Sequence, residues 1–185
     1  TGIDIADYKF RIYNSEFRIG IQSLKLNKLR NNLVQLIKVI LTETEIKKIS
    51  FGSIGLSVFD EEFIGLFNNE IPVGFQASGI PYTLTPAGIM KQWNNRISRH
   101  FHIPLQSGCD AVLKRMKRNY TISNFQFLIS NLKNKIAGFS FSTDIIVGFP
   151  GETKKEFEKT ITTITTIKTI LGKRFKKIHV FRYSS

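Results

Sequence analysis

The chain has 185 residues, 42% of them hydrophobic and 22% charged, so it can bury a core and is not a disordered polymer. No apolar run reaches the roughly 18 residues that a membrane-spanning helix needs, and no basic-then-apolar leader is visible. The single cysteine excludes an internal disulfide framework and favours a reducing, cytoplasmic compartment.

The formal net charge is +13. Cations gather in the runs Lys114–Arg118 and Lys173–Lys177. Such clusters favour a polyanionic partner through counterion release, whereas solvated helix ends are the ordinary alternative. On charge alone, a nucleic-acid partner and a plain solvated surface are equally good interpretations.

The first part of the chain predicts alternating strands and helices. Residues 1–8 have the pattern of a strand end with its loop, and apolar residues at spacings of three and four predict a helix over 27–41. Weak alternation predicts a strand over 46–54. A short helix is predicted over 59–67, because acidic residues at its start favour a first helical turn.

Residues 70–96 interrupt this alternation. They contain Pro72, Pro81 and Pro86 and show neither a helical nor a strand period. Connections between elements of a compact domain are usually much shorter. We therefore expect an inserted, exposed segment here that adds little to the core.

The second part of the chain predicts strands that lead into helices. Strands are expected over 101–105 and 139–147, and helices over 110–116 and 123–136. A last strand is expected over 178–183.

A further helix should begin after residue 153. Thr153 and Glu156 have the spacing of a capping box. We expect this helix to bury Phe157, Ile161 and Ile164, although its many β-branched residues are unusual in a helix.

Two of these strands end in loops of Gly, Ser, Gln and acidic residues, and a helical pattern follows each loop. This is typical of βα units in which the loop after the strand carries function. Two such units predict an α/β fold with parallel strands whose ends bind a polar ligand. Gln106 offers both a donor and an acceptor there, Asp144 offers an acceptor, and Gly148 permits a tight turn.

The same segments resemble a known family. His100–Asp110 (HFHIPLQSGCD), Thr143–Glu152 (TDIIVGFPGE), the linking Leu113–Thr121 and the closing Ile178–Ser184 are similar to the radical S-adenosylmethionine (SAM) methylthiotransferases of tRNA. The Gly-Cys-Asp and Lys-Arg-Met-Lys-Arg runs most resemble the branch that acts on N6-threonylcarbamoyladenosine. The resemblance is dense over residues 100–184 and thin before residue 68.

The resemblance implies an incomplete radical SAM (β/α)6 partial TIM-type barrel, from the end of strand two through strand six, with an insertion at 70–96. It implies transfer of a methylthio group to C2 of the modified adenosine in tRNA. SAM and 4Fe–4S clusters would be the cofactors, and neither a membrane nor DNA is expected as a partner. The SAM-binding residues that it implies are Gln106, Ser107, Arg118, Asp144 and Gly148.

Three of these residues have roles suggested by the chemistry of SAM. Asp144 would accept hydrogen bonds from the ribose hydroxyls, Arg118 would pair with the carboxylate, and Gln106 would complete the contact set. In the structural alternative, Gln106 caps the next helix, Arg118 is surface charge and Asp144 closes an internal hydrogen bond.

The resemblance also implies parts that are missing from residues 1–185. The family holds its cluster with a C-x3-C-x2-C loop, and it carries an N-terminal cluster domain and a C-terminal RNA-binding barrel. Cys109 cannot replace three thiolates. We therefore expect a partial core domain that is inactive by itself, and we assign it no catalytic residue and no metal ligand.

Two other functions remain open. One is a non-catalytic RNA-binding remnant that keeps the charge without the chemistry. The other is a barrel metallohydrolase that uses His100 and His102, which lie two apart on a strand and therefore point to one face. Such a pair belongs on the first strand of a metallohydrolase barrel, and the one remaining histidine, His179, lies on the last predicted strand.

Overall fold

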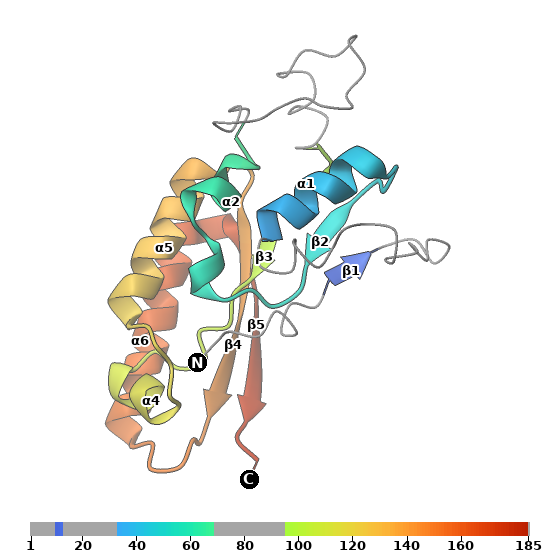
Figure 1. Cartoon of the computed structure of the whole chain (residues 1–185). Coiled ribbons are helices and arrows are strands. Elements are labelled where there is room, and N and C mark those ends of the chain that lie inside the picture. The colour runs from blue at the N-terminus through green and yellow to red at the C-terminus, as the bar shows by residue number, and fades with distance from the viewer. Residues whose placement is uncertain (1–9, 13–32, 69–94, 185) are drawn as a thin grey trace. The chain divides into compact units, whose positions relative to one another are not determined.

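The computed structural model describes residues 10–12, 33–68 and 95–184 (Figure 1). The strand end expected at 1–8 and nearly all of the insertion expected at 70–96 lie outside these ranges, so both remain predictions. The described residues fall into two compact units. One unit comprises Thr1–Gly52 with Val58–Arg99, and the other comprises Ser53–Ser57 with His100–Ser185.

The described residues of the first unit form two helices and two short strands. The helices are α1 (Leu33–Glu43) and α2 (Glu61–Gly65). Strand β1 (Phe10–Ile12) pairs antiparallel with β2 (Ile49–Phe51). This pairing differs from the all-parallel barrel that the resemblance implies, while Ile49 does form a parallel bridge to Ile97.

A local cap begins α2, and an arginine distant in sequence closes the end of α1. Asp60 is the N-cap of α2, and its side chain accepts a hydrogen bond from the Phe63 N–H at 2.7 Å. After the C-terminal turn of α1, the Arg96 guanidinium donates to the carbonyl oxygens of Leu41, Thr44 and Ile46, each at 2.6 Å. The bond to Leu41 satisfies a carbonyl that the end of the helix leaves without a partner, and the bonds to Thr44 and Ile46 hold the segment that follows. A 3-10 turn, η3 (Leu56–Val58), precedes α2.

The second unit is a three-stranded parallel sheet with helices on one side (Figure 1). Its strands are β3 (His100–His102), β4 (Ser140–Val147) and β5 (Phe175–Arg182), in that spatial order. Ser53 adds a parallel bridge to His102 at the β3 edge. The α/β class with parallel strands is therefore confirmed.

The helices of this unit are α4, α5 and α6. They span Asp110–Arg115, Ile122–Lys135 and Lys154–Leu171, close to the predicted ranges, and the short 3-10 turn η4 (Gly172–Arg174) leads into β5. Thr121 and Thr153 each begin a helix with a capping box. Among the described residues, none of the helices is both long and apolar enough to cross a membrane.

Alternation along the strands separates a buried apolar face from a polar face. Phe101, Ile103 and Leu105 alternate with polar or less buried residues, and so does Phe141 on β4. All four are fully buried. The helices complete the core with Leu113, Phe125, Ile129, Leu132 and Ile167. Each fully buried large side chain stabilises the unit by roughly 1.5–3 kcal/mol.

Helix α6 packs with a different face from the predicted one. Phe157 and Ile161 are 38% and 49% exposed, so the prediction that they are buried is wrong. The buried positions are Thr160, Thr163, Ile167 and Leu171.

The reason for this face is the close approach of α6 to Gly108. A Cβ atom on Gly108 would lie 2.6 Å from Thr160 Cα and 2.8 Å from Thr163 Cβ. Thr160 Oγ1 accepts a hydrogen bond from the Gly108 N–H at 3.0 Å, and Thr163 Oγ1 donates to the Gly108 carbonyl at 3.0 Å. Threonine is small and can satisfy the glycine backbone, which a larger apolar side chain cannot do.

Candidate functional site

The face of the sheet opposite the helices carries a continuous row of polar side chains. These side chains occupy alternate positions of their strands, and five contacts of 2.8–3.0 Å link them. The order is Ser140, His100, Ser142, His102, Asp144 and His179. A row of this kind is unusual on a parallel sheet, whose faces are normally apolar, so it marks a candidate site.

Asp144 lies at the centre of this candidate site. Its Oδ2 atom is 2.8 Å from His102 Nε2, and its Oδ1 atom is 3.0 Å from His179 Nδ1. Its backbone is in register with His179 on β5. Both carboxylate oxygens therefore have a partner inside the protein, and each keeps lone pairs for a further donor.

Gln106 follows β3 in a strained backbone conformation. Its φ angle is 65°, a region that non-glycine residues rarely occupy. Its N–H donates to the Asp144 carbonyl at 2.8 Å, and its own carbonyl accepts from the Ile146 N–H at 2.8 Å. Strain of this kind costs about 1–3 kcal/mol and tends to gather at functional sites.

Tyr120 fixes the chain just before Gln106. Its hydroxyl group contacts the carbonyl oxygens of Pro104 at 3.2 Å and Leu105 at 3.0 Å. Burial raises the pKa of Tyr120 to about 12, and the positive charge of Arg118 opposes this rise. The tyrosine is thus a neutral hydrogen-bond donor at ordinary pH.

Ser107 has a different environment from the other predicted site residues. Its side chain is fully buried, and its hydroxyl contacts Thr160 Oγ1 at 3.3 Å and accepts from the Cys109 N–H at 3.2 Å. These bonds tie the loop after β3 to α6. Within the described structure, Ser107 therefore supports the loop rather than offering a free hydroxyl.

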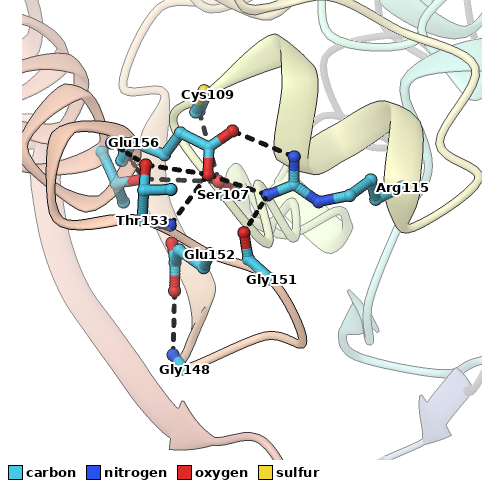
Figure 2. A network of polar contacts seen from close by, with 9 residues as sticks. Ser107, Cys109, Arg115, Gly148, Gly151, Glu152, Thr153 and Glu156 are labelled. Atoms are coloured by element: carbon cyan, nitrogen blue, oxygen red, sulfur yellow. Dashed lines mark hydrogen bonds and ion pairs between the residues drawn. The ribbon is translucent and has the colours of Figure 1, made fainter.

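The loop after β4 is held from both sides. Gly148 has a φ angle of 71°, which favours glycine, and its N–H donates to Glu152 Oε2 at 2.9 Å. Figure 2 shows the Arg115 side chain of α4 reaching across to this loop, where it donates to the Gly151 carbonyl at 3.2 Å.

The same arginine forms a bidentate ion pair with Glu156 of α6. Its Nη1 and Nη2 atoms each lie 2.9 Å from one carboxylate oxygen (Figure 2). Glu156 also caps the backbone N–H of Thr153 at 2.9 Å. The Arg115 guanidinium, together with the Thr153 N–H, lowers the pKa of Glu156 to about 2. This clasp joins α4, the loop and α6.

The structure brings Gln106 and Asp144 together, since a backbone hydrogen bond joins them, and Gly148 directly follows β4, the strand that carries Asp144. Arg118 is exposed on the turn after α4, where its N–H donates to the Leu113 carbonyl at 2.9 Å. No side-chain bond between Arg118 and the other predicted residues is present among the described residues.

Sequence reasoning missed the partnership of His102 and His179 with Asp144. It paired His102 with His100 instead, because they share a strand. The useful signal was the alternation of Ser140, Ser142 and Asp144, which places polar groups on the same face as the histidines.

Many enzymes contain a parallel α/β unit with polar residues near its strand ends. Comparison with known proteins shows to which superfamily this chain belongs. The sequence pattern of the radical SAM superfamily matches residues 28–164. The match covers well over half of the chain, so the chain belongs to this superfamily.

The individual relatives are named for the modification of two different nucleosides in tRNA. A probable threonylcarbamoyladenosine tRNA methylthiotransferase of Methanocaldococcus jannaschii is 45% identical over 75 residues, covering 40% of this chain and 18% of the relative. A threonylcarbamoyladenosine tRNA methylthiotransferase of Thermotoga maritima is 44% identical over 91 residues, covering 49% and 20%. A tRNA-2-methylthio-N(6)-dimethylallyladenosine synthase of Methylacidiphilum infernorum is 32% identical over 168 residues, covering 91% and 30%. The chain thus spans 18–30% of the length of these relatives.

Methylthiotransferases of this superfamily use SAM and 4Fe–4S clusters as cofactors. The donor set of the candidate site suits SAM, because it offers a carboxylate, an amide and the backbone of a glycine-containing turn. It does not suit a 4Fe–4S cluster, which takes cysteine thiolates. The sequence has one cysteine, Cys109, and its side chain is buried.

Proposed function

We propose that this chain is part of a radical SAM methylthiotransferase that modifies C2 of N6-threonylcarbamoyladenosine in tRNA. The observation that carries the proposal is the backbone hydrogen bond that joins Gln106, beyond the carboxyl end of β3, to Asp144 in the second half of the adjacent parallel strand β4. Ligands of parallel α/β folds bind at such ends. The superfamily match over residues 28–164 supplies the class of ligand.

Each proposed SAM contact follows from the chemistry of its group. Asp144 would accept from the ribose hydroxyls with the lone pairs that His102 and His179 leave available. Gln106 would donate and accept at the end of β3, and the open backbone of Gly148 would admit the adenine. Arg118 would pair with the SAM carboxylate, and Ser107 would keep the loop after β3 in place. Bound SAM supplies the radical chemistry of the superfamily.

The tRNA partner rests on different support. The net charge of +13 favours a polyanion, and the relatives are named for tRNA modification. The choice of the threonylcarbamoyladenosine branch rests on the Gly108-Cys109-Asp110 motif, since relatives of both branches share 44% identity with this chain. The cytoplasm is the compartment expected for such an enzyme.

Calorimetric titration of SAM into the chain tests the pocket. Asp144→Ala and Arg118→Ala should each weaken SAM binding about ten- to hundredfold, because a charge-assisted contact contributes roughly 1.5–3 kcal/mol. Lys155→Ala, which removes an exposed cation from α6, is the matched control and should bind like the parent. Unchanged affinity in both Asp144→Ala and Arg118→Ala would show that the pocket lies elsewhere.

The RNA-binding remnant makes a different prediction. It would bind tRNA with an affinity that falls steeply with salt and would not bind SAM at all. Titrating both ligands into the same preparation separates the two functions.

A further inference from the structure

His102, Asp144 and His179 place three metal-ligating groups at one point of the polar face. They come from three adjacent strands, β3, β4 and β5. One ligand atom from each residue, two imidazole nitrogens and one carboxylate oxygen, lies within 4.8 Å of the other two. We propose that this trio is a binding site for a divalent transition-metal cation, separate from any iron–sulfur cluster.

The ligand types select the class of metal. Two imidazoles and one carboxylate suit zinc or ferrous iron, whereas magnesium and calcium prefer oxygen ligands alone. A site with three protein ligands also keeps positions open for water or substrate. No thiolate takes part, so the proposed site is chemically distinct from the clusters of the superfamily.

Each histidine of the trio already lies beside a carboxylate oxygen of Asp144, at somewhat less than the spacing of two ligands on one metal ion. Bonds of roughly 2.0–2.1 Å at tetrahedral angles put neighbouring ligand atoms about 3.3 Å apart. The two nitrogen–oxygen separations are 2.8 Å at His102 and 3.0 Å at His179. His102 contacts Oδ2 and His179 contacts Oδ1, so binding of one ion requires side-chain rotations that replace both hydrogen bonds with metal bonds.

Groups outside the trio hold the His102 ring in the required orientation. The Nδ1 atom of His102 is 2.9 Å from Ser142 Oγ, which leaves Nε2 to face Asp144. Ser142 is in turn 3.0 Å from His100 Nε2, and His100 Nδ1 is 2.9 Å from Ser140 Oγ. A second partner on the far nitrogen is the usual support of a metal-binding histidine. His100 therefore belongs to the support and not to the ligands.

Solvent can reach the trio, as metal entry requires. The side chains of His102 and Asp144 are 16% and 17% exposed, and that of His179 is 38% exposed. Partial burial also limits competition from bulk water. Asp144 is the proposed ribose contact too, so a bound cation and SAM would share one carboxylate.

Titration of Zn²⁺ into the untagged, metal-stripped chain tests the site, with Co²⁺ absorption as a second probe of the ligands. We expect one equivalent to bind. His102→Gln, Asp144→Asn and His179→Gln should each lower the affinity by at least about tenfold, since even loss of a supporting residue costs a metal site about that much. Glu158→Gln, which removes an exposed carboxylate from α6, should bind like the parent.

The His179→Gln variant separates loss of metal binding from loss of folding. His179 has the most exposed side chain of the three, so its substitution should leave thermal unfolding of the metal-free chain unchanged. Absence of one-equivalent binding in the parent overturns the proposal and leaves the row as a structural hydrogen-bonded array. Binding that persists in both histidine variants also overturns it. The titration contains no SAM, so a chain that binds Zn²⁺ but not SAM supports the metal site and contradicts only the proposed function.

Discussion

Glu156 is a single carboxylate that serves both a helix start and a contact between elements. It accepts a hydrogen bond from the Thr153 N–H and accepts from both terminal nitrogens of the Arg115 guanidinium. Its pKa is lowered to about 2, first by the arginine and then by the Thr153 N–H. Because the folded pKa lies below the unfolded value of about 4.3, the folded state favours the charged form. This stabilisation is present above about pH 4.3 and is lost as the pH falls toward 2.

Glu156→Gln should therefore flatten the dependence of unfolding free energy on pH between about pH 5 and pH 2. Urea unfolding at several pH values in this interval measures the slope. Glu158→Gln changes an exposed carboxylate of the same helix and should keep the parent slope. A parent-like slope in Glu156→Gln would mean that the clasp is not formed in solution.

Gly108→Ala should destabilise the protein by roughly 1–3 kcal/mol, the usual cost of forcing an added group into a packed interior. The new Cβ would meet backbone and Cβ atoms of α6 at 2.6 and 2.8 Å, and neither can rotate away. Gly65→Ala is the control, since its Cβ would meet nothing within 4 Å and alanine favours the helix. Chemical denaturation measures both variants, and equal stability of the two would contradict the close approach of α6.

At the scale of elements, the helices of the second unit could be predicted from local sequence. The capping box at Thr153 predicted where α6 begins, and the apolar spacing over 123–136 predicted α5, whose capping box at Thr121 uses Asn124 and was recognised only in the structure. The packed face of α6 could not be predicted, because it depends on a glycine of another element. The trio around Asp144 was missed for a similar reason, since strand register is set by tertiary pairing and not by local pattern.

Ile167→Ala and Ile161→Ala form a matched pair that tests the corrected face of α6. Ile167 is 1% exposed, so its truncation should cost about 2–5 kcal/mol. Ile161 is 49% exposed, and its truncation should change stability by no more than about 0.5 kcal/mol. Thermal and urea unfolding measure the stability of both variants. A larger loss of stability for Ile161→Ala than for Ile167→Ala would support the packed face predicted from the sequence.

At the scale of the whole molecule, cofactor assembly sets the strictest limit on activity. The 185-residue chain holds one cysteine, and three thiolates are expected for the superfamily cluster. Anaerobic reconstitution with iron and sulfide should therefore leave less than one cluster per chain and no SAM cleavage. Iron and sulfide quantitation checks this, with Cys109→Ser as the control. Stoichiometric cluster in the parent that is lost in Cys109→Ser would show that the buried thiol is a ligand after all.

The parallel pairing of the second unit has a consequence for how the chain folds. Parallel strands cannot be joined by a tight hairpin, so each pairing waits for an intervening helix to form and cross over. Phe101 meets Phe141 only after α4 and α5 are placed, and Asp144 meets His179 only after α6. Contacts this distant in sequence slow folding, because the entropy of closing the intervening chain is lost before the contacts form. We therefore expect the segments of β4 and β5 to stay uncovered until α6 docks, which would expose the folding chain to association.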